Sequence, residues 1–430
     1  MSKLKKLLAV TSALLMCSGT VAYMPQDSSI SEKNTAYAAD DTAAESVLIN
    51  TKNFPDKNFG MYVANQYDKN KDGALSAEEI TNATEMRISS ENISDLTGIE
   101  YLTELKYLNC RYTELTSFDI SKNTALIELD CEAAALTSLD VSKNTALKRL
   151  YCDDNQLTSL DLSNNTALTE LRCNKNQLTS LDLSKNTALK TLYCSSNQLT
   201  SLDVSNNTAL IYFYCGGNKL TSLDVSKNVE LGWFSCSNNQ LTSLDVSQNI
   251  NLNQFYCAKN QLTSLDLSNN KKFNLCDYSG NKYKIVLTNG TFDLSTLPAG
   301  FDLSKVIYYW TNGTVEGNIL TVGDASKNVT YTYNCGNEET VKFTLVPVSL
   351  YSLGDVNGNG AVDSSDASSV LETYALVSTG GNLNLTKEQQ TAADVSRDST
   401  IDASDASLIL AYYAYIQTGG TDTFEEYLDS

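Results

Sequence analysis

The residues best suited to do chemistry are oxygen donors spaced along short stretches of the chain. Residues 68–79 read D-K-N-K-D-G-A-L-S-A-E-E, with Gly73 at the sixth place. Oxygen donors stand at positions 1, 3, 5, 7 and 12: Asp68, Asn70, Asp72, the backbone carbonyl of Ala74, and Glu79. A twelve-residue loop with this donor order and a central glycine is typical of a calcium site. A solvated acidic turn is the alternative interpretation.

Two more loops of this kind stand near the C-terminus, 39 residues apart. The first offers Asp355, Asn357, Asn359, Ala361, Asp363 and Asp366. The second offers Asp394, Ser396, Asp398, Thr400, Asp402 and Asp405. The carbonyls of Ala361 and Thr400 are the expected position-7 donors. The second loop has Ser399 at the sixth place, where glycine is expected, so we predict a strained turn and weaker calcium binding there.

Each of these two loops leads into an apolar helix, expected over 367–374 and 406–413. The duplicated loop and helix resemble a type I dockerin, which we assign to residues 353–430. The resemblance implies a small all-α fold that holds two calcium ions, and a cohesin module on a scaffoldin as partner, as in cellulosomes. It also implies the cohesin-contacting residues: Ser364, Ser365 and Leu371 in one half, and Ala403, Ser404 and Leu410 in the other. Because calcium folds such modules, chelation is expected to unfold this segment.

The centre of the chain repeats one phrase every 21 residues, and its cysteines mark the period: Cys110, Cys131, Cys152, Cys173, Cys194, Cys215, Cys236 and Cys257. A fixed period of this length predicts a solenoid. The frame L-x-x-L-x-C-x-x-N-x-L resembles leucine-rich repeats of the internalin-like, 21-residue type. The resemblance implies an α/β solenoid with a parallel sheet, which we place at 105–283 in nine copies. In the ninth copy Phe273, Cys276, Tyr278 and Tyr283 are expected to fill the apolar positions.

The repeated cysteines allow two interpretations, a ladder of buried free thiols or a set of disulfides. Cysteine is among the most buried residue types, and one cysteine per repeat at a fixed place fits a stacked core. Neighbouring strands would be roughly 4.8 Å apart, which does not exclude a bond. We favour free thiols. From the third copy on, an asparagine stands three residues after the cysteine. In the first two copies this position holds Thr113 and Ala134, so we expect their turns to be held less firmly.

Side chains that vary between copies are expected on the concave face of the sheet. Its C-terminal half is aromatic: Tyr193, Tyr212, Tyr214, Trp233 and Tyr256. Tyr151, in an earlier copy, is a further candidate ligand-binding residue on this face. Exposed aromatic side chains bind sugar rings or anchor protein partners. The mixed charges of the other half favour a protein ligand: Glu128, Asp130, Arg149, Glu170 and Arg172. Aromatic stacking that only stabilises the sheet is the alternative to a binding role.

The remaining segments flank the solenoid. Residues 1–38 have the charged start, apolar run and A-Y-A end of a secretory signal. Residues 39–104 are expected to form an N-terminal cap with the first calcium loop and an irregular first repeat. Residues 284–349 lose the period and alternate in short runs, which predicts a small all-β domain of immunoglobulin-like type.

The composition excludes several classes of ligand and of catalytic site. The 430 residues carry a formal net charge of -20 and no histidine. This charge disfavours nucleic acid and anionic membrane surfaces, and the lack of histidine excludes Ser-His-Asp and His-ligated metal chemistry. No apolar run after the signal is long enough to span a bilayer. Glu128 and Glu170 would stand two repeats apart, roughly 10 Å, which is wide for a carboxylate pair acting as acid and base.

We therefore predict a secreted, non-catalytic component of a cellulosome-type assembly. Its dockerin would bind a cohesin, and its concave face would bind a polysaccharide or a protein. An internalin-like adhesion protein and an accessory subunit of a glycoside hydrolase complex are the alternatives. The expected location is extracellular, free or held at the cell surface through a scaffoldin.

Overall fold

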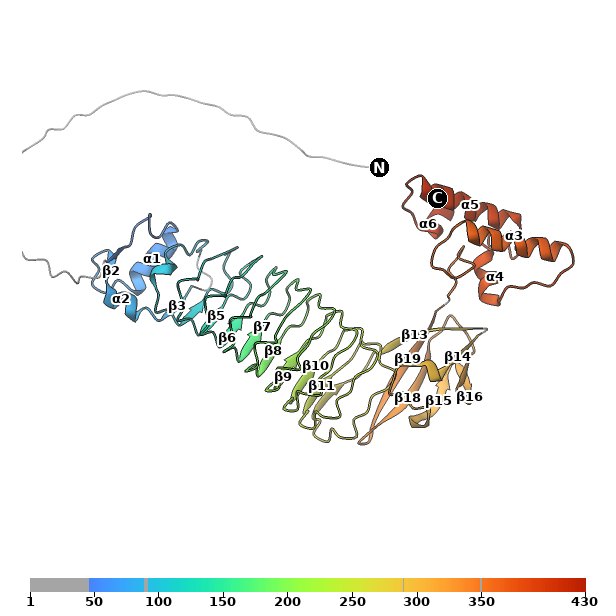
Figure 1. The fold of residues 1–430 in the computed structure, drawn as a ribbon, viewed down its shortest axis with the longest axis horizontal. Helices are drawn as coiled ribbons and strands as arrows, with labels where there is room; N and C mark the ends of the chain where they lie inside the picture. Colours follow the sequence, from blue (N-terminus) through green and yellow to red (C-terminus); the bar gives the residue numbers. More distant parts are fainter. Residues whose placement is uncertain (1–45, 89–91, 289, 349) are drawn as a thin grey trace, which may run out of the picture. The chain divides into compact units, whose positions relative to one another are not determined.

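A computed structural model describes residues 46–88, 92–288, 290–348 and 350–430. The predicted secretory signal at 1–38 lies outside the described residues. From the N-terminal side, Figure 1 shows a cap, a row of repeats, a β domain and a helical C-terminal segment.

The cap combines two short helices with a two-stranded sheet. Its elements are β1 (Val47–Leu48), α1 (Lys57–Gln66), β2 (Ala74–Leu75), α2 (Ala77–Asn82), β3 (Glu85–Arg87) and the 3-10 helix η1 (Ile99–Tyr101). The carboxylate of Asp56 accepts the first free N–H groups of α1, and Phe59 and Val63 form its buried face. Gly98 has a φ of 108°, and a Cβ there would lie 2.3 Å from the Phe54 ring. The cap's buried residues belong to the same hydrophobic cluster as those of the repeats, so the cap continues the solenoid core.

The repeats build a single ten-stranded parallel sheet in sequential order from β3 to β12. The nine regular strands are β4 (Tyr107–Asn109), β5 (Glu128–Asp130), β6 (Arg149–Tyr151), β7 (Glu170–Arg172), β8 (Thr191–Tyr193), β9 (Tyr212–Tyr214), β10 (Trp233–Ser235), β11 (Gln254–Tyr256) and β12 (Leu275–Asp277). Each strand residue pairs with the residue 21 positions later. The expected parallel-sheet solenoid is confirmed. Between 105 and 283 no helix occurs, so these short repeats return through turns.

The solenoid core consists of stacked leucines, phenylalanines and cysteines. All eight ladder cysteines are fully buried free thiols, and burial raises the pKa of each, as for Cys194, where it reaches about 12. Phe213, Phe234 and Phe255 stack with ring centroids 5.4 and 5.6 Å apart. Cys276 does not fill an apolar position as we expected, because β12 is the last strand of the sheet and this thiol is exposed.

One row of asparagines, the strand-end row, joins each repeat to the one before it. Its members are Asn155, Asn176, Asn197, Asn218, Asn239, Asn260 and Asn281. The Asn197 amide donates to the carbonyls of Cys173 at 2.9 Å and Cys194 at 3.1 Å, and its oxygen accepts the Leu178 N–H at 3.1 Å. These bonds pair backbone groups that burial would otherwise leave unsatisfied.

A second row, the turn row, lies at the far turn of each repeat: Asn123, Asn144, Asn165, Asn186, Asn207, Asn228, Asn249 and Asn270. The Asn207 amide donates to the carbonyls of Leu183 at 3.1 Å and Asn186 at 2.9 Å. The amide oxygens of this row have no hydrogen-bond partner. The turn row thus uses only its amide N–H groups, whereas the strand-end row uses the N–H groups and the amide oxygen.

The β domain has two sheets and two short 3-10 helices. β13 (Lys282–Val286), β19 (Glu339–Val348), β18 (Val329–Gly336) and β15 (Val306–Thr311) form the first sheet in that order. β14 (Thr291–Asp293), β17 (Ile319–Val322) and β16 (Gly313–Glu316) form the second, with η2 (Leu294–Thr296) and η3 (Leu303–Lys305) between strands. β13 and β19 run parallel, and the other pairs are antiparallel. The immunoglobulin-like assignment stays a prediction.

The hairpin between β18 and β19 closes the end of the solenoid. Asn337 donates to the carbonyl of Leu267 and, at 3.0 Å, to that of Asn270. These are the two carbonyls that the next member of the turn row would bind. The Leu267 N–H donates to Cys335 O at 2.7 Å, and a Cβ on Gly336, which has a φ of 86°, would clash with Ser268. The hairpin therefore imitates one further repeat.

The C-terminal segment contains α3 (Ser364–Ser378), α4 (Lys387–Ala393), α5 (Ala403–Gln417) and α6 (Phe424–Leu428). Helices α3 and α5 pack against each other. They share a small hydrophobic cluster of their own: Val356, Ala367, Val370, Ala393, Val395, Ala406, Ile409 and Phe424. The expected helical module is confirmed.

Candidate calcium loops and strand face

The three predicted calcium loops bind their own backbone in the same way at the first position. Asp68 accepts the N–H groups of Asp72 at 3.2 Å and Gly73 at 3.0 Å. In the same places of the next loop, Asp355 accepts the N–H groups of Asn359 at 3.1 Å and Gly360 at 2.9 Å.

In the third loop, Asp394 accepts the N–H groups of Asp398 at 3.1 Å and Ser399 at 3.0 Å. In all three loops the backbone therefore wraps around the carboxylate at the first position.

The closing carboxylates draw the two ends of each loop together. Glu79 accepts the N–H groups of Lys69 at 2.7 Å and Ser76 at 2.8 Å, and these bonds, first of all that from Ser76, lower its pKa to about 2. Asp366 accepts the N–H groups of Val356 and Asp363, both at 2.9 Å.

Asp405 accepts the N–H groups of Ser396 at 2.9 Å and Asp402 at 3.0 Å. In this loop the Val395 N–H bonds to Ala393 O instead of to the closing carboxylate. The second C-terminal loop is therefore closed by a slightly different set of bonds.

The fourth and sixth residues of each loop are left-handed. At the sixth place φ is 82° for Gly73, 87° for Gly360 and 69° for Ser399. A residue with a Cβ costs roughly 1 kcal/mol in this conformation relative to glycine. The predicted strain at Ser399 is confirmed, and the weaker calcium binding that we expect from it stays a prediction.

The loops fit a cation because their carboxylates are buried without a basic partner. Asp355 is 1% exposed, and Asp366 and Asp405 are fully buried. No ion pair among the described residues involves these three groups. A buried, unpaired negative charge is costly, and a bound cation would remove that cost.

In the described part of the chain, no three His, Cys, Asp or Glu side chains converge as metal ligands. A cation in these loops would therefore also need amide, hydroxyl and backbone oxygens, as the predicted ligand set provides.

The residues implied to meet cohesin lie on the surface of the helical segment. Ser364, Ser365, Ala403 and Ser404 are all exposed at the starts of α3 and α5. Leu371 is 41% and Leu410 is 42% exposed. Two leucines held in water at matching places of the two helices suit a protein interface more than a folded core.

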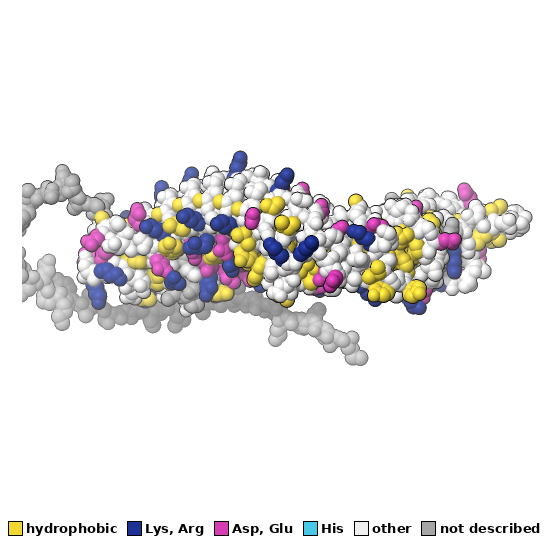
Figure 2. All heavy atoms as spheres, turned by 90° about the horizontal axis from the view of Figure 1, so that it is seen from below, with side chains coloured by type: hydrophobic (Ala, Val, Ile, Leu, Met, Phe, Trp, Pro, Cys, Tyr) yellow, Lys and Arg dark blue, Asp and Glu magenta, His cyan; other side chains and the backbone are white. Residues whose placement is uncertain are grey.

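The N-terminal half of the strand face is charged and internally paired. Arg149 pairs with Glu128, and Arg172 pairs with Glu170 at 2.7 Å. Figure 2 shows Lys, Arg, Asp and Glu side chains gathered over the N-terminal half of the repeats. Since both glutamates are bound to arginines, this face offers no free pair of carboxylates at these positions.

The C-terminal half of the strand face is aromatic and has no charged residue on β8 to β11. Tyr193 and Tyr214 stack with centroids 4.7 Å apart and planes 8° apart. Tyr212 and Trp233 meet edge to face at 5.2 Å. Burial raises the pKa of Tyr214 to about 12, so its hydroxyl stays protonated at any physiological pH.

Arg172 continues this aromatic column, which our sequence analysis did not foresee. Its guanidinium lies 5.0 Å from the Tyr151 ring centroid and 5.1 Å from that of Tyr193. The signal was present in the register, because these three residues stand 21 positions apart. Tyr151, Arg172, Tyr193 and Tyr214 thus form a continuous stack of flat groups, stabilised by cation–π contacts.

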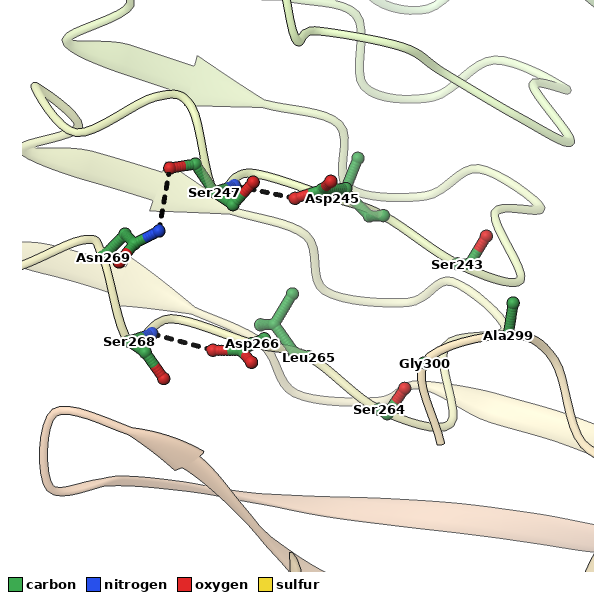
Figure 3. A pocket seen from close by; sticks show the side chains of 11 residues that line it. Ser243, Asp245, Ser247, Ser264, Leu265, Asp266, Ser268, Asn269, Ala299 and Gly300 are labelled. Atoms are coloured by element: carbon green, nitrogen blue, oxygen red, sulfur yellow. Dashed lines mark hydrogen bonds between the residues drawn. The ribbon is translucent and has the colours of Figure 1, made fainter. Parts of the chain in front are cut away.

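A cavity of about 670 Å³ lies where the last repeats meet the β domain (Figure 3). Its two carboxylates are already bound: Asp245 accepts the Ser247 N–H at 2.8 Å, and Asp266 accepts the Ser268 N–H at 2.9 Å. Asp266 also pairs with Lys305 at 2.9 Å. The cavity therefore belongs to the junction, and of its two carboxylates Asp266 is already paired with a cation.

No helix in the described residues has the length and apolar character needed to cross a membrane.

Comparison with known proteins found a family model and a relative that each match part of this chain. Residues 353–412 match the Dockerin type I domain. A stretch of 71 residues is 41% identical to Internalin J of Listeria monocytogenes serotype 4b, which corresponds to 16% of this chain and 8% of that protein. The chain therefore matches less than a tenth of that relative's length.

Several solved structures are similar in fold. The functional domain of InlJ from L. monocytogenes, described as including a cysteine ladder, is 24% identical, with a TM-score of 0.38 over 72% of this chain and 99% of that one. An internalin, InlF, of the same species is 23% identical, with a TM-score of 0.41 over 56% of this chain and 86% of that one. A leucine-rich-repeat protein of Leptospira interrogans is 23% identical, with a TM-score of 0.45 over 48% of this chain and 57% of that one.

Proposed function

We propose that this protein is an extracellular, non-catalytic adaptor that attaches to a cohesin through its C-terminal helical segment and presents the strand face of its solenoid to a ligand. The attachment depends on calcium bound in the two C-terminal loops. A third calcium ion in the loop at 68–79 stabilises the N-terminal cap.

The observation that carries the proposal is the duplicated loop in a segment that matches the Dockerin type I domain. Both loops enclose buried carboxylates that lack a basic partner, and both lead into helices with an exposed leucine at the same place. Calcium would fix the loops, and the loops set the starts of α3 and α5. The exposed serines and leucines of these helices then form the surface for cohesin.

For the ligand of the solenoid, we propose a polysaccharide bound on the aromatic half of the strand face. The strands of that half carry no charged side chain, and their rings lie next to one another along the sheet, with Tyr193 stacked on Tyr214 and Tyr212 edge to face with Trp233. A protein ligand on the charged half is the second candidate, favoured by Tyr107, which is 39% exposed beside those charges. The ion pairs there already satisfy one another, which weakens that candidate.

The cohesin contact is tested by capturing the full-length chain on immobilised type I cohesin modules, with calcium and with a chelator. We expect capture in calcium and release on chelation. An Asp355→Ala, Asp394→Ala double variant should lose capture at least about 100-fold, because each change removes a proposed ligand that also accepts two or more backbone N–H groups.

The matched control is Asp245→Ala, which removes a carboxylate that also accepts a backbone N–H but lies in a solenoid turn. This variant should be captured as the native chain is. Equal capture with and without chelator, or no capture by any type I cohesin, would contradict the proposed attachment.

A further inference from the structure

The aromatic column on the strand face is interrupted at one place. Strands β8, β9 and β11 present Tyr193, Tyr214 and Tyr256 in one register, but β10 presents Ser235 between the last two. We call this missing ring position the Ser235 gap. Trp233, 37% exposed, stands beside it on the same strand.

The size of the Ser235 gap follows from the strand spacing. Two intervals of about 4.8 Å place the Tyr214 and Tyr256 rings roughly 9–10 Å apart. A flat group in contact with both rings needs only about 7–8 Å, two contacts of ~3.5–4 Å. A puckered sugar ring is thicker than an aromatic or guanidinium plane, so it fills the gap better than a protein side chain does.

One residue at the start of strand β10 is also reduced in size. The residue before each strand carries a side chain in every regular repeat except at Gly232. Gly232 has no positive φ, and a Cβ there would meet nothing closer than 3.9 Å, so neither backbone conformation nor packing requires glycine. Gly216 differs, because a Cβ there would lie 3.0 Å from the Ser237 carbonyl oxygen, so close backbone packing accounts for that glycine. Gly232 therefore leaves space at the start of β10 that packing does not require.

The electrostatics of this region favour a neutral ligand. The four strands from β8 to β11 carry no charged side chain, and Asp277 follows Tyr256 in the same register on β12. The polar side chains on β10 and β11 are Ser235 and Gln254, whose hydroxyl and amide groups can exchange hydrogen bonds with sugar hydroxyls. An anionic glycan or a charged peptide would find no counter-charge on these strands.

We propose that the Ser235 gap is a subsite for one pyranose ring of a neutral polysaccharide, held between the faces of Tyr214 and Tyr256 and beside Trp233. This inference rests on the proposed polysaccharide-binding role of the strand face and names its central position. The sugar ring completes the stack that begins at Tyr151.

The test uses Trp233 as a reporter in the full-length chain with calcium. The chain has two tryptophans, and a Trp310→Phe background leaves only the one beside the gap. The probes are gluco-, xylo-, manno- and malto-oligosaccharides, with oligogalacturonate as the anionic comparison. We expect a saturable change in Trp233 emission with at least one neutral series and none with oligogalacturonate.

A Ser235→Tyr variant separates this inference from the general proposal. The added ring continues the register of Tyr193 and Tyr214, so the variant should fold with an unchanged or higher Tm. It should lose roughly 10- to 100-fold in affinity, because the sugar loses face contacts with two rings. Tyr256→Ala removes one wall without filling the gap, and should also weaken binding.

Asn109→Tyr is the matched control, since it adds the same side chain to the same column far from the gap, on β4. This variant should bind as the native chain does. Neutral sugar binding that persists in folded Ser235→Tyr would overturn the gap but keep the proposed function. Binding lost equally in Asn109→Tyr would also overturn the gap. No response to any neutral sugar, or a response to the anionic one alone, would overturn both.

Discussion

The solenoid and the calcium loops solve the same problem with opposite chemistry. In the solenoid, buried backbone groups of one repeat bind the neutral amide of the next, as Asn197 does for Leu178 and Cys173. In the loops, backbone N–H groups bind carboxylates such as Asp355 and Asp366. The first arrangement is complete in itself, whereas the second leaves buried negative charge that requires a cation.

This difference predicts that one chain has two kinds of stability. The solenoid's stability comes from stacking of neighbours and depends little on ions. The helical C-terminal segment has a small apolar cluster and depends on metal binding for the remainder. We expect the cap to lie between the two, because its predicted calcium loop adjoins the large core of the repeats.

Calcium removal should produce the largest difference in stability between the C-terminal segment and the repeats. With a chelator, residues 353–430 should unfold while the repeats stay folded, at a cost to the segment of about 4 kcal/mol if calcium normally exceeds its Kd 1,000-fold. Limited proteolysis read by mass spectrometry checks this, with cuts expected only after residue 350. A C-terminal segment that resists protease in chelator would contradict it.

Substitution of one asparagine in each row should lower the free energy of unfolding by different amounts. Asn197→Ala loses two donated bonds and leaves the Leu178 N–H unpaired, so we expect a loss of about 2–4 kcal/mol. Asn207→Ala loses two donated bonds but also removes an oxygen that has no partner, so about 1–2 kcal/mol is expected.

Denaturant unfolding of both asparagine variants measures the difference. Equal losses, or a larger loss at Asn207, would show that the unpartnered oxygens of the turn row are satisfied in solution, for instance by bound water.

Relief of the strained loop should give a smaller effect, confined to calcium. Ser399→Gly removes the cost of a positive φ at the sixth place, about 1 kcal/mol, so calcium affinity should rise roughly fivefold. Gly360→Ser imposes the same cost on the other loop and should lower affinity by a similar factor. Calorimetric titration measures both, and unchanged affinity in the two variants would show that the turn carries no such strain.

The smallest effect on stability is expected at Asp153, a carboxylate at a position where the next repeat has the amide of Asn174. Asp153 accepts the Asn174 N–H at 2.7 Å, and Asn174 accepts the Ser195 N–H in the same way one repeat later. Burial raises the pKa of Asp153 to about 6. The folded chain therefore binds more protons than the unfolded chain between pH 4 and 6, so this group's contribution to stability falls as pH rises through that range.

Asp153→Asn should remove that pH dependence and stabilise the chain at pH 7 by about 1 kcal/mol, allowing for partial exposure. Unfolding at pH 4.5 and pH 7 tests this. If the difference in unfolding free energy between the native chain and the variant is the same at pH 4.5 and pH 7, ionisation of Asp153 is not its cause.

The repeating part of this structure could be predicted from sequence because one phrase fixes strand, turn and core at once. The period placed Cys194 in the core and Tyr193 on the face. It failed at Cys276, where no further repeat covers the strand. It also gave no sign of Asn337, which lies outside the repeats and reaches its place only through the fold of the β domain.

For the candidate site, the loop ligands and the aromatic face were visible as residue types at fixed spacings. The stacking of Arg172 between two tyrosines was not, because a charged side chain was interpreted alone and not with its neighbours 21 residues away. The Ser235 gap likewise depends on a residue that carries no chemical signal except beside the rings that flank it.

The closing hairpin has a consequence for how this gene can change. Asn337 binds two backbone carbonyls that every repeat presents at the same place, and Lys305 pairs with an aspartate that every repeat carries. These two contacts therefore do not depend on which repeat comes last. Whole 21-residue units could be added or deleted while these contacts stay available to close the end of the solenoid. We expect the length of the strand face to tolerate such changes without a matching change in the hairpin.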